Sequence, residues 1–274
     1  MVETEPQVGL TRSEQTEVKE RAVPRTPVLY EVVRRGGEEE LRRPAASLFW
    51  SGVAGGITIM ASVIAEAALH RKLPDGAPWR EAVADLGYSL GFLMVILGRM
   101  QLFTEQTITA VLPFMAEPTL AALRRTARLW GIVLMANLVG AAAAAAMNVH
   151  LGLMGAPLLG SMLEISATLL ERSPGQVLLQ GIPAGFLIAS VAWIRAGMIG
   201  DGIAIVVVLT YAIALGDFAH VIAGSAEAFL LVFEGRISLD GAFLRVVLPS
   251  LVGNVIGGTG LFALLAHAQV REEM

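Results

Sequence analysis

One histidine lies inside a long apolar stretch of this 274-residue chain. His220 falls in the middle of an apolar segment of about residues 199–233. A single helical crossing of a bilayer needs about 20 residues, so the segment is too long for one straight crossing, and Asp217 and Gly224 interrupt it. A titratable side chain at membrane depth, beside small residues that let a helix break, indicates a functional site. Because imidazole titrates near neutral pH, His220 is suited to carry a proton or a positive charge inside a pore.

A second long apolar segment is interrupted in the same way. Its middle places Arg99, Thr104 and Glu105 at membrane depth. Polar backbone at that depth must line a cavity or be buried in protein, so we expect a broken helix whose Thr104 hydroxyl bonds to His220 or to a solute. Asp217 precedes His220 by three residues. If that segment is helical, the two share a face and the carboxylate favours the cationic imidazole.

The composition is that of an integral membrane protein. Hydrophobic residues make up 55% of the chain and charged residues 16%, against about 25% charged in an ordinary soluble domain. Cysteine is absent, which excludes a disulfide framework, a thiolate nucleophile and a cysteine metal site. No H-E-x-x-H motif and no basic stripe with interleaved aromatic residues occur, so we expect no metal, no cofactor and no nucleic-acid partner.

Six membrane spans account for the apolar segments. They are expected at about residues 47–69, 82–115, 129–147, 176–194, 199–233 and 242–268. We expect residues 1–44 to be a largely disordered cytoplasmic tail with a short surface helix at residues 28–35, and residues 269–274 to be a charged cytoplasmic stub. An interfacial helix is expected at residues 158–170.

The basic residues predict the orientation. With the N-terminus inside, 13 lysine and arginine residues fall on the cytoplasmic side and 6 on the other side. Cytoplasmic segments carry the excess of basic residues. We therefore expect both termini in the cytoplasm. We also expect a multi-pass protein of a bacterial inner membrane.

The two halves of the chain carry matching marks. Asn137-Leu-Val-Gly140 in the third span is similar to Asn254-Val-Ile-Gly257 in the sixth, 117 residues later, and Thr104 and His220 are 116 residues apart. Three spans per half make the second half enter the membrane from the opposite side. This predicts an inverted 3+3 repeat with broken second and fifth helices and a site near the midplane. The asparagines and their glycines are typical of polar links between closely packed helices.

An ordered set of motifs between about residues 45 and 268 resembles the formate/nitrite transporter family. The motifs are Leu102-Phe-Thr104, Asn137-Leu-Val-Gly140, Gly181-Ile182, Val191-Ala-Trp193, Phe218-Ala-His220 and Asn254-Val-Ile-Gly-Gly258. The resemblance implies an all-α, aquaporin-like six-helix bundle that forms a homopentamer in the lipid bilayer. It also implies a pore through each protomer for a small monovalent anion of the formate, nitrite and hydrosulfide class, or for its conjugate acid.

The resemblance also implies roles for single residues. Thr104 looks like the loop threonine of the family, and His220 looks like its central histidine. The positions that resemble the two pore constrictions are Leu102, Phe103 and Phe92 on one side and Tyr88, where the family more often has phenylalanine, on the other.

The chain departs from the family pattern at several positions. Gly224 and Gly185 stand where the family usually has asparagine, and residues 148–194 hold no lysine where one commonly precedes the fourth helix. Additional charges near the two breaks come from Arg99, Glu105, Asp217 and Glu227. Those on Arg99, Glu105 and Glu227 are expected either to pair with one another or to lie at the ends of half-helices; the alternative is that Arg99 replaces the missing lysine.

Three other functions fit parts of the sequence. The run Gly87-Tyr-Ser-Leu-Gly91 matches the G-x-S-x-G pattern of a serine hydrolase, which would make Ser89 a nucleophile and His220 its base. A neutral-solute channel would share the fold, although the paired Asn-Pro-Ala ends of such channels are absent. A protein of the same fold that transports nothing, and acts through its tail, is the third alternative.

Overall fold

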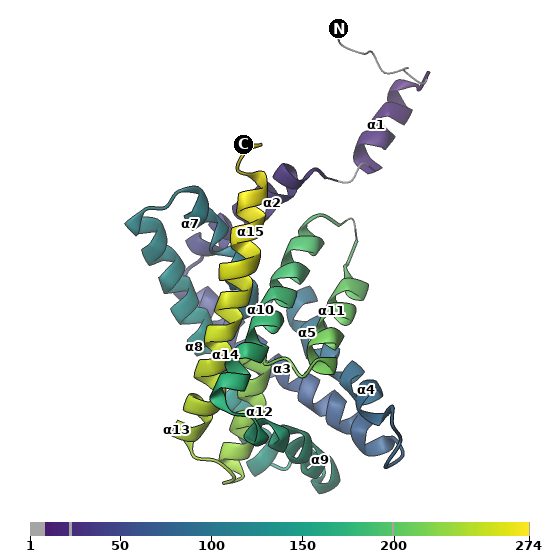
Figure 1. The fold of residues 1–274 in the computed structure, drawn as a ribbon, viewed down its shortest axis with the longest axis vertical. Coiled ribbons are helices and arrows are strands. Elements are labelled where there is room, and N and C mark those ends of the chain that lie inside the picture. Colours follow the sequence, from purple (N-terminus) through teal and green to yellow (C-terminus); the bar gives the residue numbers. More distant parts are fainter. Residues whose placement is uncertain (1–8, 22–23, 199, 274) are drawn as a thin grey trace.

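The computed structural model describes residues 9–21, 24–198 and 200–273, and every regular element in these ranges is a helix (Figure 1). Parts of the expected tail (residues 1–8 and 22–23), the expected start of the fifth span at Ile199, and Met274 lie outside the described residues.

Within the described residues, four helices are long and apolar enough to cross a membrane. They are α3 (Ala45–Lys72), α8 (Leu120–His150), α10 (Pro174–Ala196) and the continuous helix Leu239–Val270. The last comprises α13 (Leu239–Ala242), η3 (Phe243–Val247), α14 (Leu248–Val255), η4 (Ile256–Ala263) and α15 (Leu264–Val270), with η3 and η4 wound as π-helix. These four helices confirm the first, third, fourth and sixth predicted spans.

The other two predicted spans are broken, as expected. The second consists of α4 (Arg80–Ala84), η1 (Asp85–Tyr88) and α5 (Ser89–Leu97), then a gap, then α6 (Phe103–Thr109) and α7 (Leu112–Ala116). The fifth consists of α11 (Ile203–Leu215) and α12 (Val221–Phe233). Each gap begins with a glycine followed by a residue of positive φ, Arg99 at 53° and Asp217 at 54°. Non-glycine residues rarely adopt this left-handed conformation. Because it is not helical, it turns the chain out of the helix, and it does so at the same point in both halves.

The two halves run in opposite directions through the bundle. The C-terminal end of α3, at Glu66 and His70, and the N-terminal end of α10, near Val177, line one cavity at the same end of the molecule. The close helix approaches are repeated as well. A Cβ at Gly140 would lie 2.2 Å from the Val53 carbonyl oxygen, and one at Gly257 would lie 1.9 Å from that of Ile182. The predicted inverted repeat is therefore present, and glycine is required where its helices touch.

The segment before the first span differs from the expectation. Residues 28–35 belong to a longer helix, α2 (Thr26–Arg42), and a further helix, α1 (Arg12–Arg21), precedes it. The helix continues through Gly36 and Gly37. A Cβ at Gly37 would lie 1.8 Å from the Thr109 carbonyl oxygen, so glycine at this position lets α2 pack closely against the bundle. The expectation of a largely disordered tail with a short surface helix is wrong for α2, whose inner face is buried.

The buried face of α2 follows a helical stripe. Its buried residues are Tyr30, Val33, Gly37 and Leu41, at the spacing of one helix face. The Tyr30 hydroxyl lies 2.7 Å from His267 Nδ1 on α15. Hydrogen bonds from Arg34 and Arg35 lower the pKa of the partly exposed Glu31 carboxyl to about 2. The helix thus packs on the bundle through one face and carries a charged network on the other.

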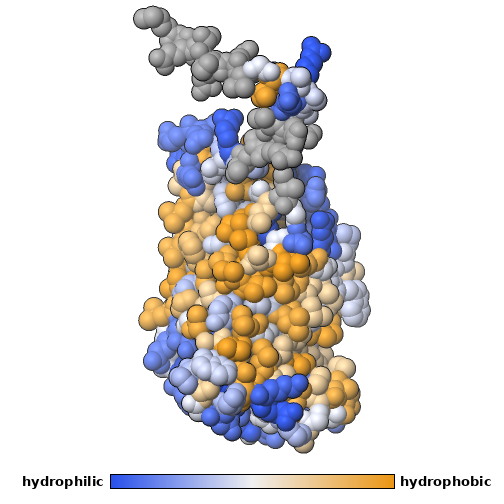
Figure 2. All heavy atoms as spheres, turned by 90° about the vertical axis from the view of Figure 1, so that its right-hand side faces the viewer, coloured by the Kyte–Doolittle hydropathy of each residue, from blue (hydrophilic) through white to orange (hydrophobic). Residues whose placement is uncertain are grey.

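The expected interfacial helix is α9 (Ala156–Ala167), which continues as a 3₁₀ turn, η2 (Thr168–Glu171). It lies with α4 at the end of the molecule away from α1 and α15 (Figure 1). The visible face of the bundle has an apolar band between two polar ends (Figure 2). Large apolar side chains exposed on the long helices include Trp50, Met135 and Leu179, as expected for a surface that contacts lipid.

Candidate functional site at the two helix breaks

His220 forms the N-cap of α12 through its own ring. Its Nδ1 atom accepts a hydrogen bond from the Ala223 backbone N–H at 3.3 Å. A nitrogen that accepts cannot carry a proton, so the ring proton is on Nε2. Nε2 lies 2.7 Å from Thr104 Oγ1 and donates to it. His220 is 1% exposed and is neutral in this arrangement.

Thr104 lies in the first turn of α6 and is fully buried. The Thr104 oxygen accepts the hydrogen bond from His220, so the Thr104 hydroxyl hydrogen is still available to donate to another group. Among the described residues, Thr104 Oγ1 has no other hydrogen-bond partner. The expected bond between Thr104 and His220 is therefore present, and it leaves one donor for a further acceptor.

Two asparagines fix the breaks by the same bonds. Asn137 Oδ1 accepts from the Phe103 N–H, and its amide donates to the carbonyl oxygens of Gly52 and Gln101, all at 2.8–2.9 Å. In the second half, Asn254 Oδ1 accepts from the Val221 N–H, and its amide donates to the carbonyl oxygens of Gly181 and Ala219 at similar distances. Both asparagines link helices, as expected, and each also satisfies the first free N–H of a half-helix.

These bonds correct the register of the repeat. Phe103 and Val221, which hold equivalent places, are 118 residues apart, not the 116 that separate Thr104 from His220. The counterpart of His220 is Leu102, since these two residues are the N-caps of α6 and α12. Thr104 lies two residues further along α6 and meets His220 across the centre of the repeat.

The four residues predicted to form the pore constrictions are all buried, but they pack against different parts of the protein. The Phe92 ring lies edge-on to the His220 ring with 4.8 Å between centroids, and Tyr88 packs against Phe92 at 5.1 Å. Leu102 is fully buried at the break between α5 and α6. The Phe103 ring instead packs against Trp130 of α8 at 5.6 Å. Phe92 is thus the aromatic residue that contacts the histidine.

Asp217 does not act on His220. The segment between α11 and α12 is not helical, so the two residues do not share a helix face, and the expectation that Asp217 favours the cationic imidazole is wrong. Its carboxylate and its carbonyl oxygen both accept hydrogen bonds from Arg172, the latter at 2.9 Å. The positive φ of Asp217 turns this residue toward the arginine that precedes α10.

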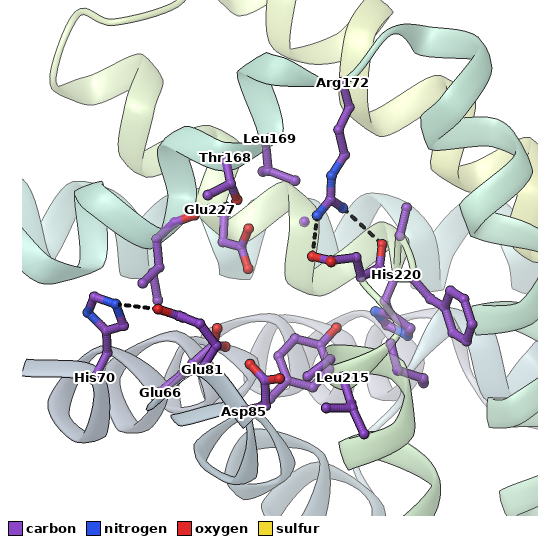
Figure 3. A pocket seen from close by; sticks show the side chains of 18 of the residues that line it. Glu66, His70, Glu81, Asp85, Thr168, Leu169, Arg172, Leu215, His220 and Glu227 are labelled. Carbon is purple, nitrogen blue, oxygen red and sulfur yellow. Dashed lines mark hydrogen bonds and ion pairs between the residues drawn. The ribbon is translucent and has the colours of Figure 1, made fainter. Parts of the chain in front are cut away.

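A cavity of about 640 Å³ reaches from the end of the molecule away from α15 to His220. Figure 3 shows acidic side chains that point into it from several helices, with Glu66 on α3, Asp85 on η1 and Glu227 on α12. Of these three, only Glu227 is a candidate on sequence grounds. The sequence gives little indication of a functional role for the other two, because Glu66 lies near the end of a predicted span and Asp85 belongs to no motif.

A second pocket, of about 380 Å³, lies on the other side of the breaks, under α2. It is lined by Arg99 and Glu105, and also by Arg195 at the end of α10. Arg99 is exposed just beyond the end of α5, so it lies at the end of a half-helix, which is one of the two positions expected. Among the described residues neither Arg99 nor Glu105 forms an ion pair.

The two glycines that replace family asparagines differ in their surroundings. A Cβ at Gly185 would lie 2.2 Å from the Asn254 carbonyl oxygen, so this glycine lets α10 and α14 touch. A Cβ at Gly224 would meet only Val246 Cγ1, at 3.6 Å. Gly224 lines the larger cavity, one helical turn after His220.

The serine of the G-x-S-x-G run is not placed for hydrolysis. Ser89 Oγ donates to the Val207 carbonyl oxygen of α11 at 3.2 Å. Both nitrogens of His220 are occupied by Thr104 and the Ala223 N–H. Ser89 therefore has no base, and the alternative of an intramembrane serine protease lacks its catalytic pair.

Comparisons with known proteins agree with this geometry. The family model described as "Formate/nitrite transporter" matches residues 27–268. The inner membrane protein YfdC of Escherichia coli (strain K12) is 36% identical over 264 residues, which cover 96% of this chain and 85% of that protein. The uncharacterized transporter YrhG of Bacillus subtilis (strain 168) is 26% identical over 248 residues, covering 86% of this chain and 91% of that one.

Two solved structures share the fold. A pentameric formate channel with formate bound has a TM-score of 0.68 at 17% identity, covering 83% of this chain and 98% of that channel. An FNT family ion channel has a TM-score of 0.73 at 16% identity, covering 89% of this chain and 96% of the other. The family match over most of the chain and the 36% identity to a relative establish that this protein belongs to the formate/nitrite transporter family.

Proposed function

We propose that each protomer conducts a small monovalent anion of the formate, nitrite and hydrosulfide class, or its conjugate acid, across the membrane between the two helix breaks. The observation that carries the proposal is the hydrogen bond of 2.7 Å between Thr104 and His220. It joins the two breaks at the centre of the repeat, with a cavity on one side and a pocket on the other.

The chemistry of this contact suits a weak acid. An isolated anion in an apolar environment costs many kcal/mol, and the walls here include the buried rings of Phe92 and Tyr88. His220 holds the Thr104 oxygen by donating to it, so the threonine hydroxyl is free to donate to a passing oxygen or sulfur atom. The N-terminal ends of α6 and α12 point at the same place and favour negative charge there.

The cationic imidazole is not required for this role. Protonation of His220 at Nδ1 would break its hydrogen bond from the Ala223 N–H and leave a helix cap empty. The neutral ring therefore acts as a fixed donor that orients Thr104, and the solute crosses the apolar wall fastest in its uncharged form.

The oligomeric state and the membrane location that we propose for this protein come from its relatives. One structural neighbour is a pentameric formate channel, and one relative is an inner membrane protein. We extend both properties to this chain, as a homopentamer in the inner membrane. The predicted cytoplasmic position of both ends of the chain agrees with the location of α1, α2 and α15 at one end of the molecule (Figure 1).

Flux into liposomes tests the proposal. Purified protein is reconstituted, and uptake of formate, nitrite, acetate, hydrosulfide and a neutral solute is measured at several pH values. We expect the wild type to pass at least one of the weak acids. We expect His220→Ala to lose most of that passage, because Thr104 then loses the donor that fixes its oxygen.

The matched control is His150→Ala. His150 is exposed at the end of α8, where its ring packs against Phe233 at the C-terminal end of α12, away from both breaks. This variant should pass the solute at the wild-type rate. Flux no higher than in protein-free liposomes, for every solute and equally in wild type and His220→Ala, would reject the pore and favour a protein of this fold that transports nothing.

A further inference from the structure

The first turns of α8 carry a group of arginines that the bundle does not neutralise. Arg124, Arg125 and Arg128 are all exposed, and α8 starts at the end of the molecule where α2 and α15 lie (Figure 1). Among the described residues, none of the three forms an ion pair. Arg124 and Arg128 are four residues apart, so they share a helix face, where two like charges destabilise the helix. An anion at this place would remove that repulsion.

The end of α2 meets these arginines without supplying a carboxylate to them. Arg128 donates to the Arg43 carbonyl oxygen at 3.3 Å, just after α2 ends. Glu40, the last carboxylate of α2, is already paired with Arg43 at 2.9 Å. The contact with α2 therefore holds the Arg128 side chain in place but leaves its charge without a partner.

Beyond the arginines, the same face of α8 is apolar. Gly131 and Met135 follow Arg124 by seven and eleven residues, which is the spacing of one helix face. Both are exposed, and a Cβ at Gly131 would meet nothing within 4 Å. At about 1.5 Å per residue, the distance from Arg124 to Met135 is roughly 16 Å, close to half of the ~30 Å hydrocarbon core. The face thus changes from cationic to apolar over the depth of one leaflet.

We propose that this face of α8 binds an anionic phospholipid, whose phosphate contacts Arg124 and Arg128 and whose acyl chain lies along Gly131 and Met135. The planar guanidinium group of arginine suits the headgroup, because it donates two hydrogen bonds to one phosphate. The missing side chain at Gly131 lets an acyl chain approach the helix backbone. The site is separate from the two breaks, so it does not depend on the passage of any solute.

Native mass spectrometry of the full-length protein measures the binding. Detergent-solubilised protein is titrated with phosphatidylglycerol and, separately, with phosphatidylcholine that has the same acyl chains. We expect the wild type to bind phosphatidylglycerol at least about tenfold more tightly, since several basic residues attract one anionic headgroup. Arg124→Gln with Arg128→Gln should abolish this preference, and each single substitution should give an intermediate value.

The matched control is Arg71→Gln with Lys72→Gln. These two residues are exposed at the C-terminal end of α3, at the other end of the molecule, and their substitution changes the net charge by the same amount. This variant should keep the wild-type preference. Soluble glycerophosphoglycerol carries the headgroup phosphate without acyl chains and should not displace the lipid. Displacement at equal concentration would show that the site takes a free phosphate ester, and would overturn the assignment to a lipid.

Quenching by brominated lipids tests the position of the site. The chain has no cysteine, so Gly131→Cys and Leu179→Cys each supply one thiol for a bimane label, the latter on α10 where Leu179 is also exposed. In phosphatidylcholine bilayers with a small fraction of brominated phosphatidylglycerol, quenching is compared with that by brominated phosphatidylcholine at the same fraction. The label on Gly131→Cys should be quenched about twofold or more strongly by the anionic lipid, and the label on Leu179→Cys equally by both.

The two arginine substitutions should remove this excess quenching from the label on Gly131→Cys. Equal binding of the two lipids by the wild type, an unchanged preference in the double arginine variant, or equal quenching by the two brominated lipids next to Gly131 would each overturn the proposal.

Discussion

Asn137 and Asn254 make the same three hydrogen bonds in the two halves of the protein. Each side-chain oxygen caps the first N–H of a half-helix, and each amide bridges a break to a neighbouring transmembrane helix. Both side chains are fully buried. The breaks, which a membrane tolerates only when their backbone groups are satisfied inside the protein, are thus stabilised by one residue each.

The first prediction concerns these asparagines. Asn137→Leu should lower the midpoint of thermal unfolding by roughly 5–15 °C, because each buried backbone group left unpaired costs about 1–3 kcal/mol. The measurement is the thermal unfolding of detergent-solubilised protein. Asn148→Leu is the control on the same helix. Asn148 is also buried. Its amide donates within α8 to the Ala144 carbonyl oxygen, and its side-chain oxygen has no partner among the described residues, so a shift of the same size there would argue against the capping role of Asn137.

The second prediction separates the two glycines that replace family asparagines. Gly185→Asn should destabilise the protein severely, since its Cβ would lie 2.2 Å from a backbone oxygen of α14 and the two helices must move apart. Gly224→Asn should fold, because only Val246 lies near its Cβ. Yield and monodispersity of the purified variants measure the difference. A well-folded Gly185→Asn protein would show that α10 and α14 do not pack as closely as described.

The third prediction tests the tautomer of His220. Because Nδ1 accepts from the Ala223 N–H, Nε2 must carry the proton that Thr104 accepts. Thr104→Val removes that acceptor and should lower solute flux by about tenfold or more, as expected for a buried donor left unpaired. Thr104→Ser keeps the hydroxyl and should retain most of the flux. Nitrogen NMR of labelled histidine, with His220→Ala to assign the signal, should show the Nε2–H tautomer; an Nδ1–H signal would contradict the geometry.

The fourth prediction concerns the attachment of α2 to the bundle. Tyr30→Phe removes the hydrogen bond to His267 Nδ1 but keeps the buried ring. The loss of about 1–3 kcal/mol should speed amide hydrogen exchange in α2 by roughly tenfold, while exchange in α8 stays unchanged. Val32→Ala on the exposed face of the same helix is the control and should leave the exchange rates of α2 as they are. Equal exchange in Tyr30→Phe and wild type would mean that apolar packing alone holds the helix.

The features that the bilayer constrains can be derived from the amino-acid order. Six apolar segments, two of them too long for one crossing, follow from the length a helix needs to span hydrocarbon. The polar residues that interrupt the long segments, Thr104 and His220, had to be buried together because unsatisfied backbone cannot face lipid. The matched asparagines indicated the inverted repeat for the same reason. The buried stripe of α2 was also legible in the spacing of Tyr30, Val33 and Leu41, although two glycines obscured it.

The meeting of the charged groups depends instead on the packing of distant helices. Asp217 lies three residues from His220 in sequence, yet its positive φ turns it to Arg172, which no local pattern predicts. Glu66, Asp85 and Glu227 come from three separate elements and line one cavity only because α3, η1 and α12 converge there. Hydropathy and helix periodicity report on short stretches of chain, whereas the field inside a pore depends on contacts between residues more than a hundred positions apart. The spans and the central histidine could therefore be predicted from the sequence, but the acidic cavity that leads to it could not.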